Sequence, residues 1–549
     1  MLNRRTFLKA AGGGVAAAMA AHLARPWSAK AAAKGAATPS PRPNILLIMA
    51  DDMGYSDAGC YGGDIDTPNL DALAEGGLRF TQHYSTARCW PSRACILTGY
   101  YAQHIRRDSV KGIKMGGRPP WAPLLPEYLK PLGYRAYHSG KWHIDGQPTQ
   151  NGFDRSWGRE RRGCDPNRYF ASKRWKEDGA AAPVEPGEPY YSTVAVADHA
   201  IQCLKLHKAH HGGEPFFQYV AFFSPHFPLQ ALAKDVAKYR DAYTAGWDVI
   251  RKRRWTRMKE MGIVTCPLSE RDPKIIPPWN FKPEQLEEQI GPGEAPYAVA
   301  WDSLSEEEKK FQAIKMAVHA AMIHRMDAEI GRIVRQLKDM GAFENTLIVF
   351  ASDNGASAEQ IIRGDGHDTS ARPGGPKSFL CLGPGWSTAS NTPFRLHKHW
   401  NHEGGISSPL IVHWPDGISA RGELRHAPSH FIDFVPTAVE LAGGKLPETY
   451  KGRNVPPKDG MSLVPVFQKD GALPERTLWW CHQGNRAIRV GDWKLCARRR
   501  THDTWELYDL TNDRCEMNDL SDEHPEKVKA LEEKWQAFVR GFCRDLKRK

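Results

Sequence analysis

The segment NILLIMADD, residues 44–52, joins an uninterrupted apolar run to two adjacent carboxylates. Three later segments have a similar form: residues 134–143 end in Gly-Lys-Trp-His, residues 216–226 in Ser-Pro-His, and residues 346–354 in Ser-Asp-Asn. Continuous apolar runs of this length are typical of strands that are buried on both faces of a parallel sheet. Because ligands of such sheets bind outside the carboxyl ends of the strands, we expect these polar endings to converge on one edge.

Helical patterns separate the apolar runs. Thr67 and Pro68 supply an N-cap and a first-turn proline for a helix that we expect to end at the following Gly-Gly pair. Ser305 and Glu308 form a capping-box pattern, which opens a longer helix with apolar residues at helical spacing. The alternation of strands and helices predicts an α/β domain over residues 43–467, in which helices flank a mostly parallel mixed sheet.

A smaller C-terminal α+β subdomain is predicted over residues 468–549. Residues 486–490, 493–496 and 505–508 are short apolar segments separated by turn residues. Such a pattern is typical of a small antiparallel sheet. An amphipathic pattern over residues 526–542 predicts that a helix follows this sheet.

Residues 227–300 interrupt the predicted domain as a variable insertion, and we expect this segment to be irregular. It contains the basic run Arg-Lys-Arg-Arg at residues 251–254 and the proline-rich run Ile-Pro-Pro-Trp at residues 276–279. Two interpretations remain open. The insertion is either a solvated surface segment or a wall of the substrate pocket.

Residues 1–42 have the pattern of an export signal followed by a linker. Arg4 and Arg5 precede a weakly apolar Ala/Gly run over residues 10–21, and Ala-Lys-Ala at residues 29–31 is a candidate cleavage site. This pattern is typical of a twin-arginine (Tat) signal; the alternative is a basic, disordered tail. No later apolar run reaches the roughly 18 residues that a bilayer span needs. We therefore expect the Tat export machinery as a partner, no stable membrane span, and a periplasmic or secreted protein.

Composition and charge narrow the class of protein further. The 549 residues are 41% hydrophobic and 25% charged, which is ordinary for a soluble globular enzyme. The formal net charge of +12 falls to about +7 without the five basic residues of the first 31, and this balance suits an anionic substrate. No long Lys/Arg block is interleaved with aromatics, so we expect no nucleic-acid partner. Eleven scattered cysteines, without CxxC spacing, predict neither a disulfide framework nor a zinc site.

Oxygen donors follow two of the predicted strands. Asp51 and Asp52 end the first apolar run, and Asp353 and Asn354 end the run at residues 346–354. Hard oxygen donors without sulfur or imidazole partners suit Ca²⁺ or Mg²⁺ better than zinc. Taken alone, either pair could equally be a helix cap or a turn.

The stretch TARCWPSRACILTG, residues 86–99, predicts a short helix with Cys89 at its N-terminus. Pro91 suits the first turn, and Arg93 lies one turn further on, where it can reach the same point in space. Unpaired N–H groups at a helix N-terminus favour an anion. The plain alternative for Cys89 is a buried structural thiol.

The order Cys-x-Pro-Ser-Arg at residues 89–93 is also a family signature. It resembles the motif of type I sulfatases, the formylglycine-dependent, arylsulfatase-like enzymes of the alkaline phosphatase superfamily. Further segments match that family in order along nearly the whole chain after the signal. They are residues 49–55, 67–71, 140–143, 224–226, 352–355 and 393–405, and then residues 459–463 and 493–495, which look like the C-terminal portion of the family.

The resemblance implies a cofactor and a modification. One Ca²⁺ per chain would be held by Asp51, Asp52, Asp353 and Asn354, together with a Cα-formylglycine made from Cys89. A formylglycine-generating enzyme would act on Cys89 during maturation. The hydrated aldehyde would then attack the sulfur of a sulfate ester, with activation by the metal and by nearby charge.

The resemblance also assigns roles to charged and imidazole side chains. Arg93 would hold the formylglycine, and Lys141 and Lys398 would bind the sulfate oxygens. His226 would protonate the leaving alcohol, and His143 would contact the second hydroxyl of the hydrate and help to regenerate the aldehyde. The stretch that contains Lys398 is richer in histidine than is common in the family, so His226 need not be the sole acid.

The substrate class is less specified. Eighteen tryptophans, an anion-compatible charge and an export signal favour sulfated carbohydrate over steroid or simple aryl sulfate. Two alternatives remain: a phosphodiesterase or phosphonate monoester hydrolase on the same scaffold, and a non-catalytic sugar-binding relative.

Overall fold

The computed structural model describes residues 42–159, 169–170, 175–182, 190–364, 366–499 and 504–547. The predicted signal peptide, and all of the predicted linker except Arg42, lie outside this range. Within the described ranges, no helix combines the length and the apolar character that a membrane crossing requires.

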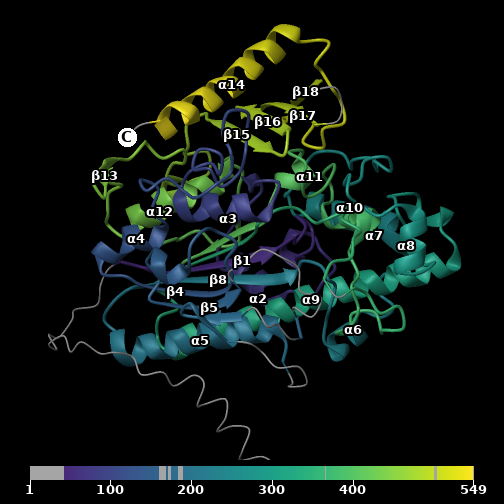
Figure 1. Cartoon of the computed structure of the whole chain (residues 1–549), viewed down its shortest axis with the longest axis horizontal. Helices are drawn as coiled ribbons and strands as arrows, with labels where there is room; N and C mark the ends of the chain where they lie inside the picture. The colour runs from purple at the N-terminus through teal and green to yellow at the C-terminus, as the bar shows by residue number, and fades with distance from the viewer. Residues whose placement is uncertain are drawn as a thin grey trace, which may run out of the picture. The chain divides into compact units, whose positions relative to one another are not determined.

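A ten-stranded mixed sheet lies at the centre, in the order β11-β2-β10-β9-β1-β8-β4-β5-β6-β7 (Figure 1). Its middle is parallel: β1 (Asn44–Asp51) pairs with β8 (Phe216–Pro225) and with β9 (Thr346–Ser352), and β8 pairs with β4 (Arg135–Lys141). These are the four segments that predicted buried parallel strands, and that prediction is confirmed. The other strands are β2 (Leu78–Phe80), β5 (Arg155–Arg159), β6 (Trp175–Glu177), β7 (Ala180–Ala181), β10 (Leu410–His413) and β11 (Glu423–Arg425). β10 runs antiparallel to both of its neighbours.

Helices cover both faces of this sheet. In chain order, the α-helices of the described residues are α2 (Pro68–Glu75), α3 (Cys89–Thr98), α4 (Leu125–Leu129), α5 (Ser192–His211), α6 (Ala233–Lys238), α7 (Gly246–Glu260), α8 (Pro283–Gln289), α9 (Glu306–Asp339), α10 (Gly383–Ser390), α11 (Glu403–Ile406), α12 (Phe434–Leu441), α13 (Val464–Gln468) and α14 (Pro525–Lys547), the last of which packs on the C-terminal sheet instead. Figure 1 shows α3 and α12 on one side of the sheet and α5 on the other, where α5 and α9 both contact β8. The expected α/β architecture is confirmed.

The two predicted helix starts are also confirmed. α2 begins at Pro68 and ends just before the Gly-Gly pair. At the start of α9, the hydroxyl of Ser305 accepts a hydrogen bond from the backbone N–H of Glu308 (3.2 Å). The carboxylate of Glu308 accepts one from the backbone N–H of Ser305 (2.7 Å), so the capping box is reciprocal.

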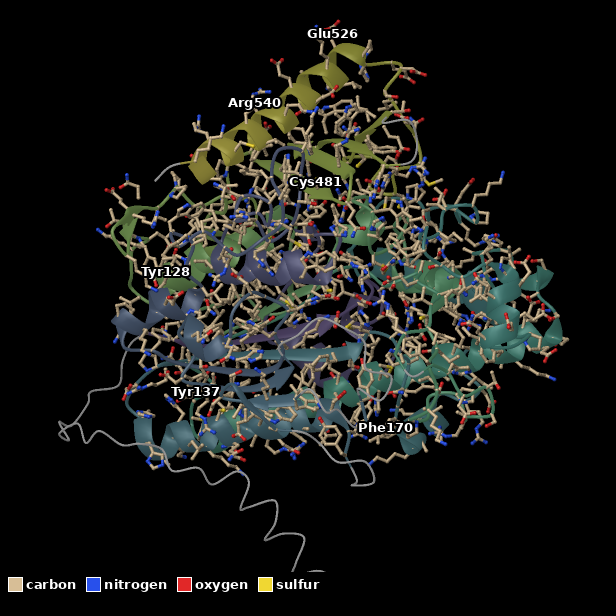
Figure 2. The ribbon with its side chains drawn as sticks, in the orientation of Figure 1. Tyr128, Tyr137, Phe170, Cys481, Glu526 and Arg540 are labelled. Carbon is tan, nitrogen blue, oxygen red and sulfur yellow. The ribbon has the colours of Figure 1, made fainter. Side chains whose placement is uncertain are left out.

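The C-terminal sheet is antiparallel, in the order β15 (Thr477–His482), β16 (Asn485–Val490), β17 (Trp493–Ala497) and β18 (Trp505–Asp509). The sequence predicted the last three strands and the helix, which extends from Pro525 to Lys547. β15 was not predicted. α14 lies across this sheet at the top of Figure 1, with Glu526 and Arg540 exposed along it (Figure 2).

One apolar cluster runs through both sheets. It joins Leu47 of β1 and Leu97 of α3 to Trp479 of β15 and to Trp535 and Phe542 of α14. All five side chains are at most 3% exposed. The two sheets therefore share one hydrophobic core, although they are separate hydrogen-bonded units. The boundary at residue 467 stays a prediction.

The expectation that residues 227–300 are irregular is wrong, because α6, α7 and α8 all lie in this segment. α7 was missed because arginines occupy part of its inward face. Arg254 is fully buried and binds Asp57 (2.8 Å) and Asp64 (2.6 Å), while Arg251 donates to Ser269. The basic run that contains these arginines is thus partly an internal network rather than a solvated cationic surface.

Candidate active site

The four predicted oxygen donors meet where β1 and β9 end. Ala50 and Ser352 are register partners, so Asp51, Asp52, Asp353 and Asn354 follow at the same edge of the sheet. Each is at most 3% exposed. Nδ2 of Asn354 donates to Oδ1 of Asp52 (2.7 Å), and the backbone N–H of Asp52 donates to Oδ1 of Asp353 (3.3 Å). Adjacent parallel strands bring the two pairs together, as the sequence led us to expect.

Cys89 is the first residue of α3 and reaches the same cluster. Its Sγ and carboxylate oxygens of Asp51 and Asp353 lie within 4.8 Å of one another. Burial raises the pKa of the thiol above its ordinary value, although Lys141 and Lys398 act against this rise. The side chain is therefore a neutral thiol rather than a thiolate at neutral pH, so its own nucleophilicity is low.

Three cations surround the carboxylates. Arg93 binds Asp353, Lys141 binds Asp51, and Lys398 lies 2.6 Å from Oδ1 of Asp52. The predicted site residues thus form one cluster, in which every side chain except the partly exposed His143 is buried: Asp51, Asp52, Cys89, Arg93, Lys141, His143, His226, Asp353, Asn354 and Lys398. The charges balance, since three cations face three carboxylates, and this balance offsets much of the cost of burying them.

The charges also act on the carboxyl pKa values. Burial raises the pKa of Asp51, but attraction to Lys141 and Arg93 outweighs burial and leaves that pKa below its ordinary value. Burial raises the pKa of Asp353 to about 6, and repulsion from Asp51 adds to the rise. An additional cation would therefore favour the ionised form of Asp353.

The donor set fits a divalent cation. Oδ1 of Asp51 and Oδ1 of Asn354 are buried and accept no hydrogen bond from the described residues. Buried acceptors of this kind are costly unless they have a partner, and an oxygen-binding ion supplies one. Carboxylate and amide oxygens are the ligands that Ca²⁺ prefers, so the cluster satisfies the chemistry that the sequence predicted.

Two family models match the chain. The model described as sulfatase matches residues 43–444, and the model described as N-sulphoglucosamine sulphohydrolase, C-terminal, matches residues 394–539. The chain belongs to the sulfatase family. The resemblance found in the sequence is confirmed: the protein is a type I sulfatase of the alkaline phosphatase superfamily, and its enzyme class is sulfuric ester hydrolase.

Individual relatives of this sulfatase agree with the family models. An uncharacterized sulfatase of Schizosaccharomyces pombe is 31% identical over 91% of this chain and 94% of its own length. The N-acetylglucosamine-6-O-sulfatase of Bacteroides thetaiotaomicron is 28% identical over 89% of this chain and 85% of its own length. Among solved structures, the complex of Ps i-CgsB with k-i-k-neocarrahexaose has a TM-score of 0.63 at 24% identity, covering 90% of this chain and 92% of that one. Its likeness shows the shared fold.

Two histidines of the sulfatase face the cluster from different loops. Nδ1 of His143 lies 3.4 Å from Sγ of Cys89. Nδ1 of His226 lies 2.6 Å from the carbonyl oxygen of Phe227, which can only accept, so Nδ1 carries the proton. Nε2 of His226 therefore faces Oδ2 of Asp52, at 3.6 Å, and is the nitrogen that can exchange a proton in the site.

Backbone strain accumulates around this site. Asp52, His143 and His399 have φ values of 69°, 57° and 94°, in the left-handed region that side chains other than glycine rarely adopt. Each such residue costs on the order of 1–3 kcal/mol and persists only where its surroundings enforce it. The cluster geometry is thus maintained at the expense of local backbone energy.

The histidine-rich stretch around Lys398 does not add metal ligands. His397 exchanges a hydrogen bond with Ser387 (2.7 Å), and His402 binds Glu506 (2.8 Å). His399 instead packs against Trp279, with ring centroids 4.7 Å apart, and lines a groove beside the site. These histidines therefore make polar and aromatic contacts around the site and do not join the metal-binding cluster.

Sequence reasoning missed Glu359. Its buried carboxylate binds Arg88 (3.2 Å), lies 3.7 Å from Nζ of Lys398 and accepts a hydrogen bond from Nε1 of Trp279 (2.9 Å). Burial raises the pKa of Glu359, but Arg88 and Lys398 outweigh burial and hold that pKa far below its ordinary value. Nothing in the local sequence marks this residue, because its partners come from distant segments.

Proposed function

We propose that this sulfatase hydrolyses sulfate esters of carbohydrates with a formylglycine made from Cys89 and with Ca²⁺ bound beside it. One observation carries the proposal. Residue 89, at the N-terminus of α3, lies within 4.8 Å of two carboxylates at the ends of β1 and β9. The residue that would carry the nucleophile therefore lies beside the candidate cation site. It also lies at a helix N-terminus, which favours anions.

The balance of charge supports an anionic substrate. Because the three carboxylates and three cations of the cluster offset one another, a divalent ion makes the site net positive. Asp51, Asp52, Asp353 and Asn354 would hold this ion. When bound, Ca²⁺ would stabilise negative charge on the sulfate oxygens, and hydrated formylglycine would supply the attacking hydroxyl.

The remaining side chains have distinct tasks. Lys141 and Lys398 would donate to the sulfate oxygens, whose charge shifts as the ester bond breaks. Arg93 would hold residue 89 and keep Asp353 in place. His226, with Nδ1 fixed by a carbonyl oxygen, would deliver a proton from Nε2 to the leaving alcohol. His143 would accept a proton from the hydroxyl of residue 89 that does not attack.

A carbohydrate substrate is favoured by the relative from Bacteroides thetaiotaomicron, whose name describes an N-acetylglucosamine-6-O-sulfatase. The aromatic side chains beside the site agree with this choice, since aromatic faces stack on sugar rings. The alcohol of a sugar leaves poorly as an alkoxide, which explains why an acid at His226 would matter.

The test begins with maturation. The chain is co-expressed with a formylglycine-generating enzyme, and peptide mass analysis checks conversion of Cys89. Turnover of 4-nitrophenyl sulfate and of bis(4-nitrophenyl) phosphate is then compared. We expect the sulfate ester to react faster and Cys89→Ala to be inactive, while the matched thiol control Cys543→Ala keeps its rate. A faster phosphodiester reaction would establish the rival hydrolase, and an inert, fully converted protein would indicate a sugar-binding relative.

We also propose that residues 1–42 direct this sulfatase through the Tat machinery to the periplasm or beyond. The paired Arg4 and Arg5 before a mild apolar run support this assignment. Replacing both arginines with lysine should retain the protein inside the cell. Export at an unchanged rate would contradict the proposal.

A further inference from the structure

A large open groove lies beside the cluster. It has a volume of about 1170 Å³, which is above the range of about 300–1,000 Å³ that is usual for small-ligand pockets. Its lining includes residues 274–283 of the insertion, together with residues 483–486 and 498–499 in and next to the strands of the C-terminal sheet. Cys481 of β15, labelled beneath α14 in Figure 2, belongs to the lining.

The side chains of this groove carry charge of one sign. None of its described lining residues is Asp or Glu, although the sequence contains 63 acidic residues. A groove lined by one sign of charge concentrates ions of the opposite sign. The cationic lining residues are Lys111, Lys274, Lys282, Arg486, Arg498 and Arg499.

Some of these cations are paired with neighbouring side chains, and others are exposed. Arg498 pairs with Glu506 (3.1 Å), and Arg486 lies over the ring of Trp505, so both have ordered positions. Lys282 and Arg499 are exposed, and they come from two different segments of the lining, the insertion and the C-terminal region. Exposed guanidinium and ammonium groups on long stems can reach sulfate or carboxylate groups of a bound chain.

The wall of the groove contacts residues that adjoin the reacting cluster. Trp279 of its wall packs against His399, the neighbour of Lys398. The guanidinium of Arg88, the residue before Cys89, lies 5.6 Å from the ring of Trp279. A sugar ring beside the reacting sugar would thus meet an aromatic wall, and its next neighbour would meet cations.

We propose that this groove binds the part of a sulfated oligosaccharide beyond the reacting sugar, and that it selects substrates with further anionic groups. This inference rests on the proposed function and deepens it: the preferred substrate is a polyanionic oligosaccharide rather than a singly sulfated monosaccharide. Lys282 and Arg499 contact the additional sulfate or carboxylate groups, and Trp279 contacts a sugar face.

The binding test does not depend on turnover. A heparin-derived tetrasaccharide is titrated calorimetrically into the full chain carrying Cys89→Ala. Adding Lys282→Gln and Arg499→Gln should weaken binding at least tenfold. A matched pair on exposed surface outside the groove, Lys469→Gln with Arg540→Gln, should change it less than twofold. Desulfated tetrasaccharide should bind at least tenfold more weakly. Added salt should weaken the binding of the sulfated tetrasaccharide, because it screens the charges. Equal binding by both pairs of variants, or no binding to the parent chain, overturns the proposal.

A kinetic test separates the two proposals. In the matured enzyme, Lys282→Gln with Arg499→Gln should leave kcat/KM for 4-nitrophenyl sulfate within twofold, because this ester is too small to reach the groove. The tetrasaccharide should inhibit this reaction at least tenfold less well in the variant. If the tetrasaccharide inhibits the variant and the parent enzyme equally, the groove proposal is wrong but the proposed function stands. If the enzyme with verified formylglycine does not turn over sulfate esters, the proposed function itself is wrong.

Discussion

Arg93 donates two hydrogen bonds to a single oxygen of Asp353: Nε lies 2.9 Å and Nη2 lies 2.7 Å from Oδ2. Both side chains are completely buried. The other oxygen of Asp353, Oδ1, therefore faces the cluster, where it accepts a hydrogen bond from the backbone N–H of Asp52. The ion pair therefore connects α3, which carries residue 89, to the end of β9.

Replacing Arg93 should damage stability and activity together. Arg93→Met leaves the buried carboxylate of Asp353 without its cation, so we expect a loss of about 3–5 kcal/mol in the free energy of unfolding. Urea unfolding of the pure protein measures this loss. Adding Asp353→Asn should restore much of the stability but no sulfatase activity. A single variant as stable as the wild type would contradict the buried geometry.

Calcium should stabilise the folded protein. An ion that binds only the native state raises the free energy of unfolding by about 2.7 kcal/mol at a concentration of 100 times its Kd. We expect chelation to lower the Tm and Ca²⁺ to restore it, as measured by calorimetry. Asn354→Ala should reduce the Tm response, because it removes an orphaned oxygen of the cluster. If Ca²⁺ leaves the Tm of both proteins unchanged, the proposed calcium site is wrong.

Glu359 should position Lys398. Glu359→Gln removes the buried charge between Lys398 and Arg88, so we expect kcat/KM for sulfate esters to fall at least tenfold. Glu359→Asp, which keeps the charge, should recover part of the rate. Separate measurement of kcat and KM distinguishes a displaced lysine from a general loss of folded protein, and near-normal kinetics in the Gln variant would exclude this role.

Stability should change with pH through His104. This buried imidazole lies 3.0 Å from Asp459 and 3.4 Å from Asp545 of α14. Burial lowers the pKa of His104, but the two carboxylates outweigh burial and raise it to about 9. Because the folded pKa exceeds the unfolded one of about 6.5, the stabilisation is complete below pH 6.5 and is lost as the pH rises through 9.

The matching variant is His104→Gln. Its stability deficit, of up to about 3 kcal/mol at pH 6, should shrink as the pH approaches 10. Urea unfolding at several pH values gives the comparison, and Asp545→Asn should show a weaker form of the same trend. A deficit that is constant from pH 6 to 10 would show that His104 acts through packing alone.

The features that the sequence predicted well are those fixed by neighbouring residues. The run at residues 44–52 predicted both a buried strand and a carboxylate pair at its end, and parallel pairing then brought Asp51 next to Asp353. The capping box at Ser305 needed only the residue three positions later. Such features depend on local chemistry and on one general rule of sheet topology.

The features that escaped prediction depend on distant partners. Glu359 acquires its importance from Arg88, which is 271 positions away in sequence. α7 was missed because Arg254 faces inward to two aspartates, whereas arginine in a pattern normally indicates a solvated face. Neither contact leaves a periodic signal in a single sequence.

The shared core has a consequence for biogenesis. α14 is synthesised after every other element that packs into that core, and its Trp535 and Phe542 cover Trp479 of β15. Until those residues leave the ribosome, the apolar surface beneath them stays open to water. A nascent chain of this protein must therefore remain soluble while part of its hydrophobic core is exposed. Premature termination before residue 525 leaves that apolar surface exposed and yields an aggregation-prone product.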